Sequence, residues 1–138
     1  MKKVMVFGTF DIVHLGHIHV FKEAKKHGDS LVVVIARDQN TSMVKGTAPF
    51  HTEKERLEFI QELQIVDKAV LGDNKDPYKV ILTHKPEVIA LGYDQTQFVD
   101  KLEAFIKEHL PETKIVRIEG HNVHKHKSSI IKSFFLNT

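Results

Sequence analysis

One stretch near the start of the chain decides its fold: Val4-Met5-Val6-Phe7, followed by Gly8-Thr9-Phe10-Asp11 and then by Ile12-Val13-His14-Leu15-Gly16-His17. The first four residues form an apolar run typical of a buried strand, and a helical pattern follows the histidines. A strand that turns through glycine into a helix start is where parallel α/β sheets bind phosphate. Gly16 has no side chain, so a phosphate can approach the backbone between the two imidazoles. We therefore expect a nucleotide triphosphate at this turn.

Strand-like and helix-like segments alternate along the rest of the chain. Strands are predicted at Lys3 to Phe7, Leu31 to Ala36, Lys68 to Leu71, Val88 to Leu91 and Lys114 to Ile118. Helices are predicted at Ile18 to Lys26, after the capping box Thr52-Glu53-Lys54-Glu55, after the cap Asp76-Pro77, from Gln97 to His109 and from Ser128 to Phe135. The alternation and right-handed crossovers predict an α/β fold: a single-domain, Rossmann-like, doubly wound sheet of five parallel strands, order 3-2-1-4-5, with helices on both faces.

Length and composition set the class of protein. The 138 residues, 41% of them hydrophobic and 28% charged, suit one globular domain over residues 1–138. No apolar stretch reaches the roughly 20 residues of a membrane helix, and the start lacks a secretory signal, so we expect a cytoplasmic protein without membrane contact. The absence of cysteine excludes disulfides and thiolate zinc sites. A net charge of +2 with dispersed lysines does not favour nucleic-acid binding.

The unusual residues follow the predicted strands at their carboxyl ends. Gly8 to Asp11 follow the first strand, Arg37-Asp38 the second, Gly92-Tyr93-Asp94 the fourth and Glu119 to Ser129 the fifth. Open α/β sheets bind ligands at this edge, so we expect these segments to share one crevice.

The motif from Gly8 to His17 resembles the signature of the cytidylyltransferase-like nucleotidyltransferases. Val66 to Val70, Ala90 to Gln95 and Lys127 to Lys132 fall where that family has its later motifs. Within the family, Leu91 to Gln95 and the strand end Val32 to Asp38 resemble the archaeal FAD synthases. The glycerol-3-phosphate cytidylyltransferases share the first motif equally well.

The resemblance implies transfer of AMP from ATP to FMN, with FAD and pyrophosphate as products. His14 and His17 are expected to donate to the phosphates, together with Thr9 and with Lys45, which lies in a polar connection able to fold over the substrate. The expected nucleotide-binding residues are Gly8, Thr9, Phe10, His14, Gly16, His17, Gly92, Tyr93, Asp94, Ser128 and Ser129, and the expected acceptor-binding residues are Asp11, Asp38, Lys45 and Arg56. Mg²⁺ is expected to arrive with the nucleotide, without a set of protein ligands. Relatives of this size are usually homodimers.

Several of these residues also have purely structural interpretations. The histidines could cap the first helix, and Ser128 could cap the last one. Asp11 beside a phosphate site either contacts a ligand or shapes the turn, and Gly92-Tyr93-Asp94 could be a tight turn. Phe134 and Phe135 either complete the core or meet a second subunit.

The tract His121-Asn122-Val123-His124-Lys125-His126-Lys127 is harder to assign. It could present a basic, titratable surface to a phosphorylated acceptor or bind a transition metal, although most histidine-rich loops are solvated.

Two other functions compete with the first. One keeps the chemistry and uses CTP with glycerol 3-phosphate or another alcohol phosphate. The other is a regulatory domain that binds a nucleotide without turnover, although the sequence lacks none of the expected catalytic groups.

Overall fold

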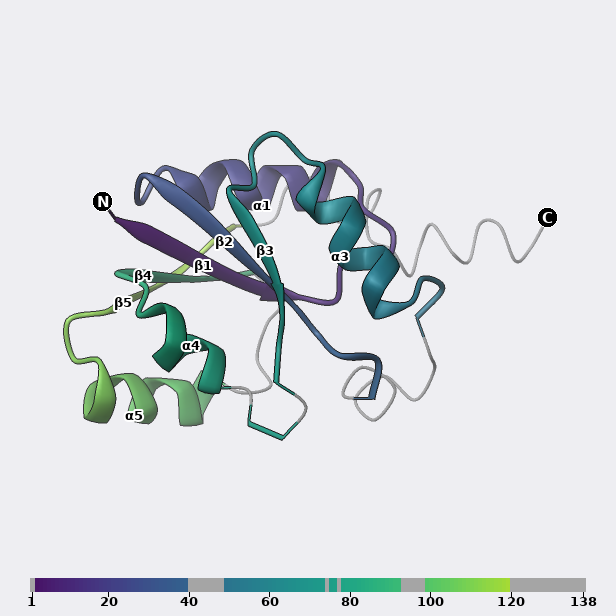
Figure 1. The fold of residues 1–138 in the computed structure, drawn as a ribbon. Helices are drawn as coiled ribbons and strands as arrows, with labels where there is room; N and C mark the ends of the chain where they lie inside the picture. The colour runs from purple at the N-terminus through teal and green to yellow at the C-terminus, as the bar shows by residue number, and fades with distance from the viewer. Residues whose placement is uncertain (1, 40–48, 74, 77, 93–98, 120–138) are drawn as a thin grey trace.

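Five strands alternate with four helices in the described part of the chain, which comprises residues 2–39, 49–73, 75–76, 78–92 and 99–119 of a computed structural model (Figure 1). In chain order the elements are β1 (Lys3–Gly8), α1 (Leu15–Lys25), β2 (Ser30–Ile35), α3 (Glu53–Gln61), β3 (Lys68–Leu71), α4 (Lys79–His84), β4 (Val88–Leu91), α5 (Val99–His109) and β5 (Lys114–Arg117). The predicted strands are confirmed to within one residue at each end.

The strands form one parallel sheet in the order β3-β2-β1-β4-β5, as predicted. β1 lies at the centre, where Gly8 pairs with Ile35 of β2 and Val6 pairs with Ala90 of β4. The chain therefore winds to one side of β1 and then to the other. This reversal places the end of β1 at the point where such sheets bind ligands.

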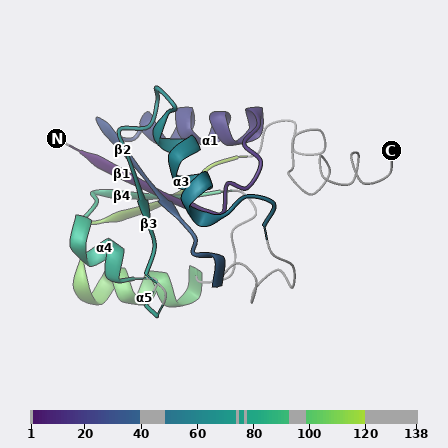
Figure 2. The same cartoon turned by 45° about the vertical axis from the view of Figure 1, so that its right-hand side comes forward.

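Alternate residues of the strands enter two separate cores. Val4 and Val6 pack in a cluster with Phe21 of α1 and Ile60 of α3. Met5 points to the other face and packs in a cluster with helices α4 and α5. Figures 1 and 2 show the same division, with α1 and α3 on one face of the sheet and α4 and α5 on the other. Strands buried on both faces explain the continuous apolar runs of the sequence.

Two helix starts differ from the prediction. α1 begins at Leu15 rather than at Ile18, because His14 caps it. Leu15 is 64% exposed and adds nothing to the apolar period from which the start was predicted. α4 begins at Lys79 without a side-chain cap, and the Asp76 carboxylate instead accepts the N–H of Tyr78 in the preceding turn. The prediction that Asp76 caps this helix was therefore wrong.

The capping box of α3 is confirmed. Thr52 accepts the Glu55 N–H at 3.2 Å, and the Glu55 carboxylate accepts the Thr52 N–H at 2.9 Å. Two donors that the helix leaves without intrahelical partners are satisfied in this way. None of the helices in the described ranges is long and apolar enough to cross a membrane.

Candidate active site

The histidine pair lies where β1 ends and α1 begins. The N-cap residue of α1 is His14, whose Nδ1 accepts the Gly16 N–H at 3.1 Å. His17 Nδ1 accepts the His14 N–H at 3.2 Å, which completes a reciprocal box made of two imidazoles. The rings stack with centroids 4.0 Å apart and planes 28° apart. The capping interpretation of the two histidines is thus confirmed.

These hydrogen bonds determine the state of both rings. A ring nitrogen that accepts an N–H carries no proton, so each imidazole is neutral with its hydrogen on Nε2. Nε2 lies across the ring from Nδ1, away from the helix amide that Nδ1 binds. Capping therefore uses the Nδ1 atom of each ring and not Nε2. The same bonds that cap α1 orient two N–H donors, which can stabilise charge that develops on a phosphate.

The ring of Phe10 packs against His17 of the histidine pair. Its ring is buried among the core side chains and meets His17 edge to face, with centroids 5.4 Å apart. The ring also lies on Gly8, where a Cβ atom would come within 2.6 Å of the Phe10 ring. Phe10 itself has a φ of 54°, in the left-handed region that favours glycine. The Phe10 ring therefore packs against His17 and Gly8, and its contact with the nucleotide stays a prediction.

Asp11 shapes a second loop. Its carboxylate is 5% exposed and accepts the N–H groups of Phe50 and His51 at 2.7 and 2.8 Å. Because both oxygens are used by backbone 39 and 40 residues away, the turn-forming interpretation is supported. The alternative, that Asp11 contacts the acceptor, does not fit this geometry.

Arg56 was expected to contact the acceptor, and the structure corrects this prediction. Its side chain is 0% exposed. The guanidinium donates to Thr9 O at 2.8 Å, to Ala36 O at 2.9 Å and to His51 O at 3.3 Å. It also pairs with Asp38 at 2.6 Å. Arg56 therefore joins the ends of β1 and β2 to the start of α3, and no surface is left for a phosphate.

Asp38 is bound on one side and open on the other. One oxygen accepts from Arg56 and the other from the Glu53 N–H at 3.1 Å, while the side chain remains 42% exposed. Glu53 returns the contact by accepting the Asp38 N–H, and it pairs with Arg37. The hydrogen bond from the Asp38 N–H is the largest cause of the lowered pKa of the Glu53 carboxyl. Burial raises this pKa, and Arg37 lowers it further. An ionised Glu53 thus holds the end of β2 to the start of α3.

Sequence reasoning missed Glu53 and Arg37 as parts of this network and misjudged Arg56. One signal was present. Arg56 lies four residues before buried Ile60, so the two share the core face of α3. A charged residue on a core face is expected to be buried and paired rather than exposed to ligand.

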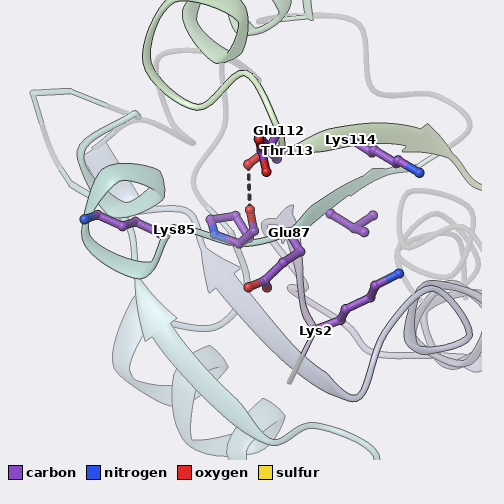
Figure 3. Close-up of a pocket in the computed structure, with 8 residues that line it drawn as sticks. Lys2, Lys85, Glu87, Glu112, Thr113 and Lys114 are labelled. Carbon is purple, nitrogen blue, oxygen red and sulfur yellow. Dashed lines mark hydrogen bonds between the residues drawn. The ribbon is translucent and has the colours of Figure 1, made fainter.

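The described residues offer no group of three or more metal-ligating side chains. A hollow among the described residues lies at the opposite end of the sheet, where β1, β4 and β5 begin (Figure 3). The residues that line it are Lys2, Lys85, Pro86, Glu87, Val88, Glu112, Thr113 and Lys114. None of them belongs to the predicted site.

The model of the cytidylyltransferase-like family matches residues 5–134. This chain belongs to the cytidylyltransferase-like family. The match includes the histidine turn, the network around Arg56 and the later segments, so the family assignment made from the motifs is confirmed.

Two similar proteins of archaea are named FAD synthases. A protein from Thermoplasma volcanium called FAD synthase is 45% identical over 132 residues, 96% of this chain and 92% of the relative. An FAD synthase from Archaeoglobus profundus is 43% identical over 87% of this chain and 76% of its own.

Solved structures agree on the fold. A structure titled lipopolysaccharide core biosynthesis protein, from Thermoplasma volcanium, is 48% identical with a TM-score of 0.80 and covers 88% of this chain and 99% of its own. The pantoate-beta-alanine ligase of Francisella tularensis has a TM-score of 0.67 at 19% identity, covering 96% of this chain and 65% of its own, and supports the fold alone.

Of the remaining predicted site residues, two are described. Gly92 follows β4 and its carbonyl accepts from Arg117 Nη1 at 2.8 Å, and Gly16 is the second residue of α1. Lys45, Tyr93, Asp94, Ser128, Ser129, the tract from His121 to Lys127, Phe134, Phe135 and the predicted helix from Ser128 to Phe135 lie outside the described residues.

Proposed function

We propose that this protein is an FAD synthase, which transfers the AMP group of ATP to FMN and releases pyrophosphate. The observation that carries the proposal is the stacked pair of imidazoles at the end of β1, whose Nδ1 atoms both accept backbone N–H groups. Relatives 41–45% identical that bear the name FAD synthase support the choice of reaction. The predicted function is in agreement with these names.

The chemistry requires positioning and charge stabilisation more than covalent help. A phosphate oxygen of FMN attacks the α-phosphorus of ATP, and the bond from that phosphorus to the bridging oxygen of the β-phosphate breaks. The electron pair leaves with pyrophosphate. The Nε2–H groups of His14 and His17 would donate to the phosphates as this charge builds, and Thr9 would add a further donor from the end of β1.

Mg²⁺ fits the site as a companion of the nucleotide. The Asp11 oxygens are committed to backbone N–H groups, so they do not form a carboxylate site for a cation. Mg²⁺ prefers phosphate oxygens and retained waters to a full protein cage. Bound in this way it would neutralise phosphate charge, while the chain contributes the histidine donors.

The other roles stay predictions. We assign the base and ribose of ATP to Gly92-Tyr93-Asp94, the outer phosphates to Ser128 and Ser129, and the acceptor to Asp38 and Lys45. We assign positioning roles to Arg56 and Asp11, which their contacts with backbone groups support. A single domain over residues 1–138, a homodimer and a cytoplasmic location also stay predictions.

A pyrophosphate-release screen tests the proposal. The protein is incubated with Mg²⁺, each of four nucleotide triphosphates, and FMN, glycerol 3-phosphate or pantetheine phosphate, and products are identified by mass. We expect release with ATP and FMN only, together with FAD. Turnover of CTP with glycerol 3-phosphate would support the competing transferase instead. Nucleotide binding without any release would support the regulatory domain.

A further inference from the structure

Phe50 is an exposed aromatic residue at the carboxyl edge of the sheet. Its side chain is 76% exposed, the highest value among the large exposed hydrophobic residues in the described ranges. It lies two residues before the N-cap of α3, in the connection that leads from the end of β2 to this helix. Single exposed hydrophobic residues are common, so exposure alone indicates no function.

The backbone that carries Phe50 is held by two buried charged residues. The Phe50 and His51 N–H groups donate to the Asp11 carboxylate, and the His51 carbonyl accepts from Arg56. Asp11 and Arg56 are 5% and 1% exposed. Two buried ionic groups thus fix a two-residue segment whose aromatic side chain stays in solvent. A fixed apolar surface loses little entropy when a ligand packs on it.

Asp11 links the Phe50 backbone to the segment that carries the histidine pair. Asp11, which holds Phe50, lies three residues before His14. The Phe50 ring meets the His51 ring at 86° with centroids 4.8 Å apart, a contact that limits its rotation. Leu15, between the two histidines, is a second exposed apolar residue. Because α1 and α3 cover the same face and both begin at the carboxyl edge, the two residues lie at helix starts on one side of the sheet (Figure 1).

We propose that Phe50 binds the flat isoalloxazine ring of FMN and selects an aromatic acceptor over a small alcohol phosphate. The inference rests on the proposed function and names the acceptor subsite within it. Phe50 comes from the β2 side of β1, whereas Gly92, assigned to the nucleotide, follows β4 on the other side. The two substrates would then enter from opposite sides of β1 and meet at the histidines. In-line transfer would require the FMN phosphate oxygen to lie opposite the leaving pyrophosphate. Glycerol 3-phosphate has no ring to pack on Phe50.

The test compares Phe50→Ala with Phe59→Ala. Phe59 is 55% exposed and lies near the end of α3, the helix whose start follows Phe50. The control therefore removes an exposed phenylalanine away from the candidate site. We expect Phe50→Ala to raise KM and Kd for FMN about tenfold, the usual scale for loss of one aromatic stacking contact. KM for ATP, kcat and the circular dichroism spectrum should stay unchanged. Phe50→Tyr should restore FMN binding and Phe50→Leu should restore it only in part.

Three results would overturn the inference. They are an unchanged FMN affinity in Phe50→Ala, a rise in KM for ATP instead of FMN, and a change in sedimentation with FMN affinity unchanged, which would mark a subunit contact. Should Phe50→Ala fail to fold, Phe50→Leu against Phe50→Tyr decides the same question. If the unmodified protein forms FAD and Phe50→Ala binds FMN normally, the inference alone fails. If the unmodified protein does not use FMN, the proposed function fails.

Discussion

The two ends of the parallel sheet need opposite hydrogen-bonding partners. At the carboxyl end, parallel strands finish in carbonyl groups that need donors. Each of the three arginines of the chain supplies them: Arg56 to Thr9 O and Ala36 O, Arg37 to Gly72 O and Arg117 to Gly92 O. The carbonyls that follow β1, β2, β3 and β4 all receive an arginine N–H in this way.

At the amino end the strands begin with N–H groups that need acceptors, and carboxylates supply them. Asp67 accepts from Leu31 N at 2.7 Å, Glu87 from Lys3 N at 2.6 Å and Asp29 from Lys2 N at 2.8 Å. These hydrogen bonds are the largest cause of the lowered pKa of Asp67 and of Glu87.

The charged side chains that supply these hydrogen bonds also differ in burial between the two ends. The Asp67 side chain is 44% exposed, whereas the Arg56 side chain is completely buried. A buried charge must be matched by all of its partners at once, so it holds them in one arrangement. The buried Arg56 therefore joins its backbone partners at the end that carries the histidine pair.

The largest expected effect is that of Arg56→Leu. Removing the guanidinium leaves three carbonyl groups and the Asp38 carboxylate without their donor, and we expect a loss of about 3–5 kcal/mol in the free energy of unfolding. Urea denaturation measures it. Arg117→Leu removes an exposed arginine from the same edge and should cost below about 1 kcal/mol. Equal losses in the two variants would show that burial does not set how much an arginine at the carboxyl end contributes.

The next effect concerns rate rather than stability. His14→Ala removes one oriented N–H donor, so we expect kcat for pyrophosphate release to fall about 10²- to 10³-fold. Loss of the α1 cap should cost only about 1 kcal/mol of stability. Steady-state kinetics and urea denaturation separate the two quantities. A variant with normal kcat would show that the histidines are caps and nothing more.

Asp11→Ala should lower both the stability of the protein and its affinity for FMN, each to an intermediate degree. Two backbone N–H groups of the segment that carries Phe50 lose their acceptor, at a cost of about 1–3 kcal/mol. The same loss frees this segment, so KM for FMN should rise while KM for ATP changes less. Asp11→Asn keeps one acceptor oxygen, so it should recover part of the stability and part of the affinity for FMN. An Asp11→Ala variant with wild-type KM for FMN would separate this loop from the acceptor.

The smallest effect is expected at the amino end. Because the folded-state pKa of Asp67 is lowered, its ionised form stabilises the fold above the unfolded value, about 4 for such carboxyls, and this contribution is lost as pH falls through the folded value. Asp67→Ala should therefore cost at most about 1 kcal/mol at pH 7 and flatten the loss of stability below pH 4. Denaturation across pH measures this, and FAD formation should not change. Reduced activity would mean that the amino end also positions the site.

The strands and their order were predictable from the sequence because both depend on local signals. Runs such as Val32 to Ile35 are apolar on both faces, and right-handed crossovers leave few ways to arrange five such strands. The histidine motif marked the end of β1 for the same reason. Helix starts were less predictable: α1 begins with exposed Leu15, which an apolar period does not detect.

The sequence by itself placed Gly8 to Asp11, Arg37-Asp38 and Gly92 at the carboxyl ends of their strands, since residue type and strand position are local properties. Only the tertiary structure decided what they do there. Arg56 was expected at a phosphate and instead binds Thr9 O, 47 residues away, and Asp11 binds the amide of His51, 40 residues away. Whether a charged side chain faces solvent or backbone depends on which polar groups the fold brings beside it, and those partners come from distant parts of the chain.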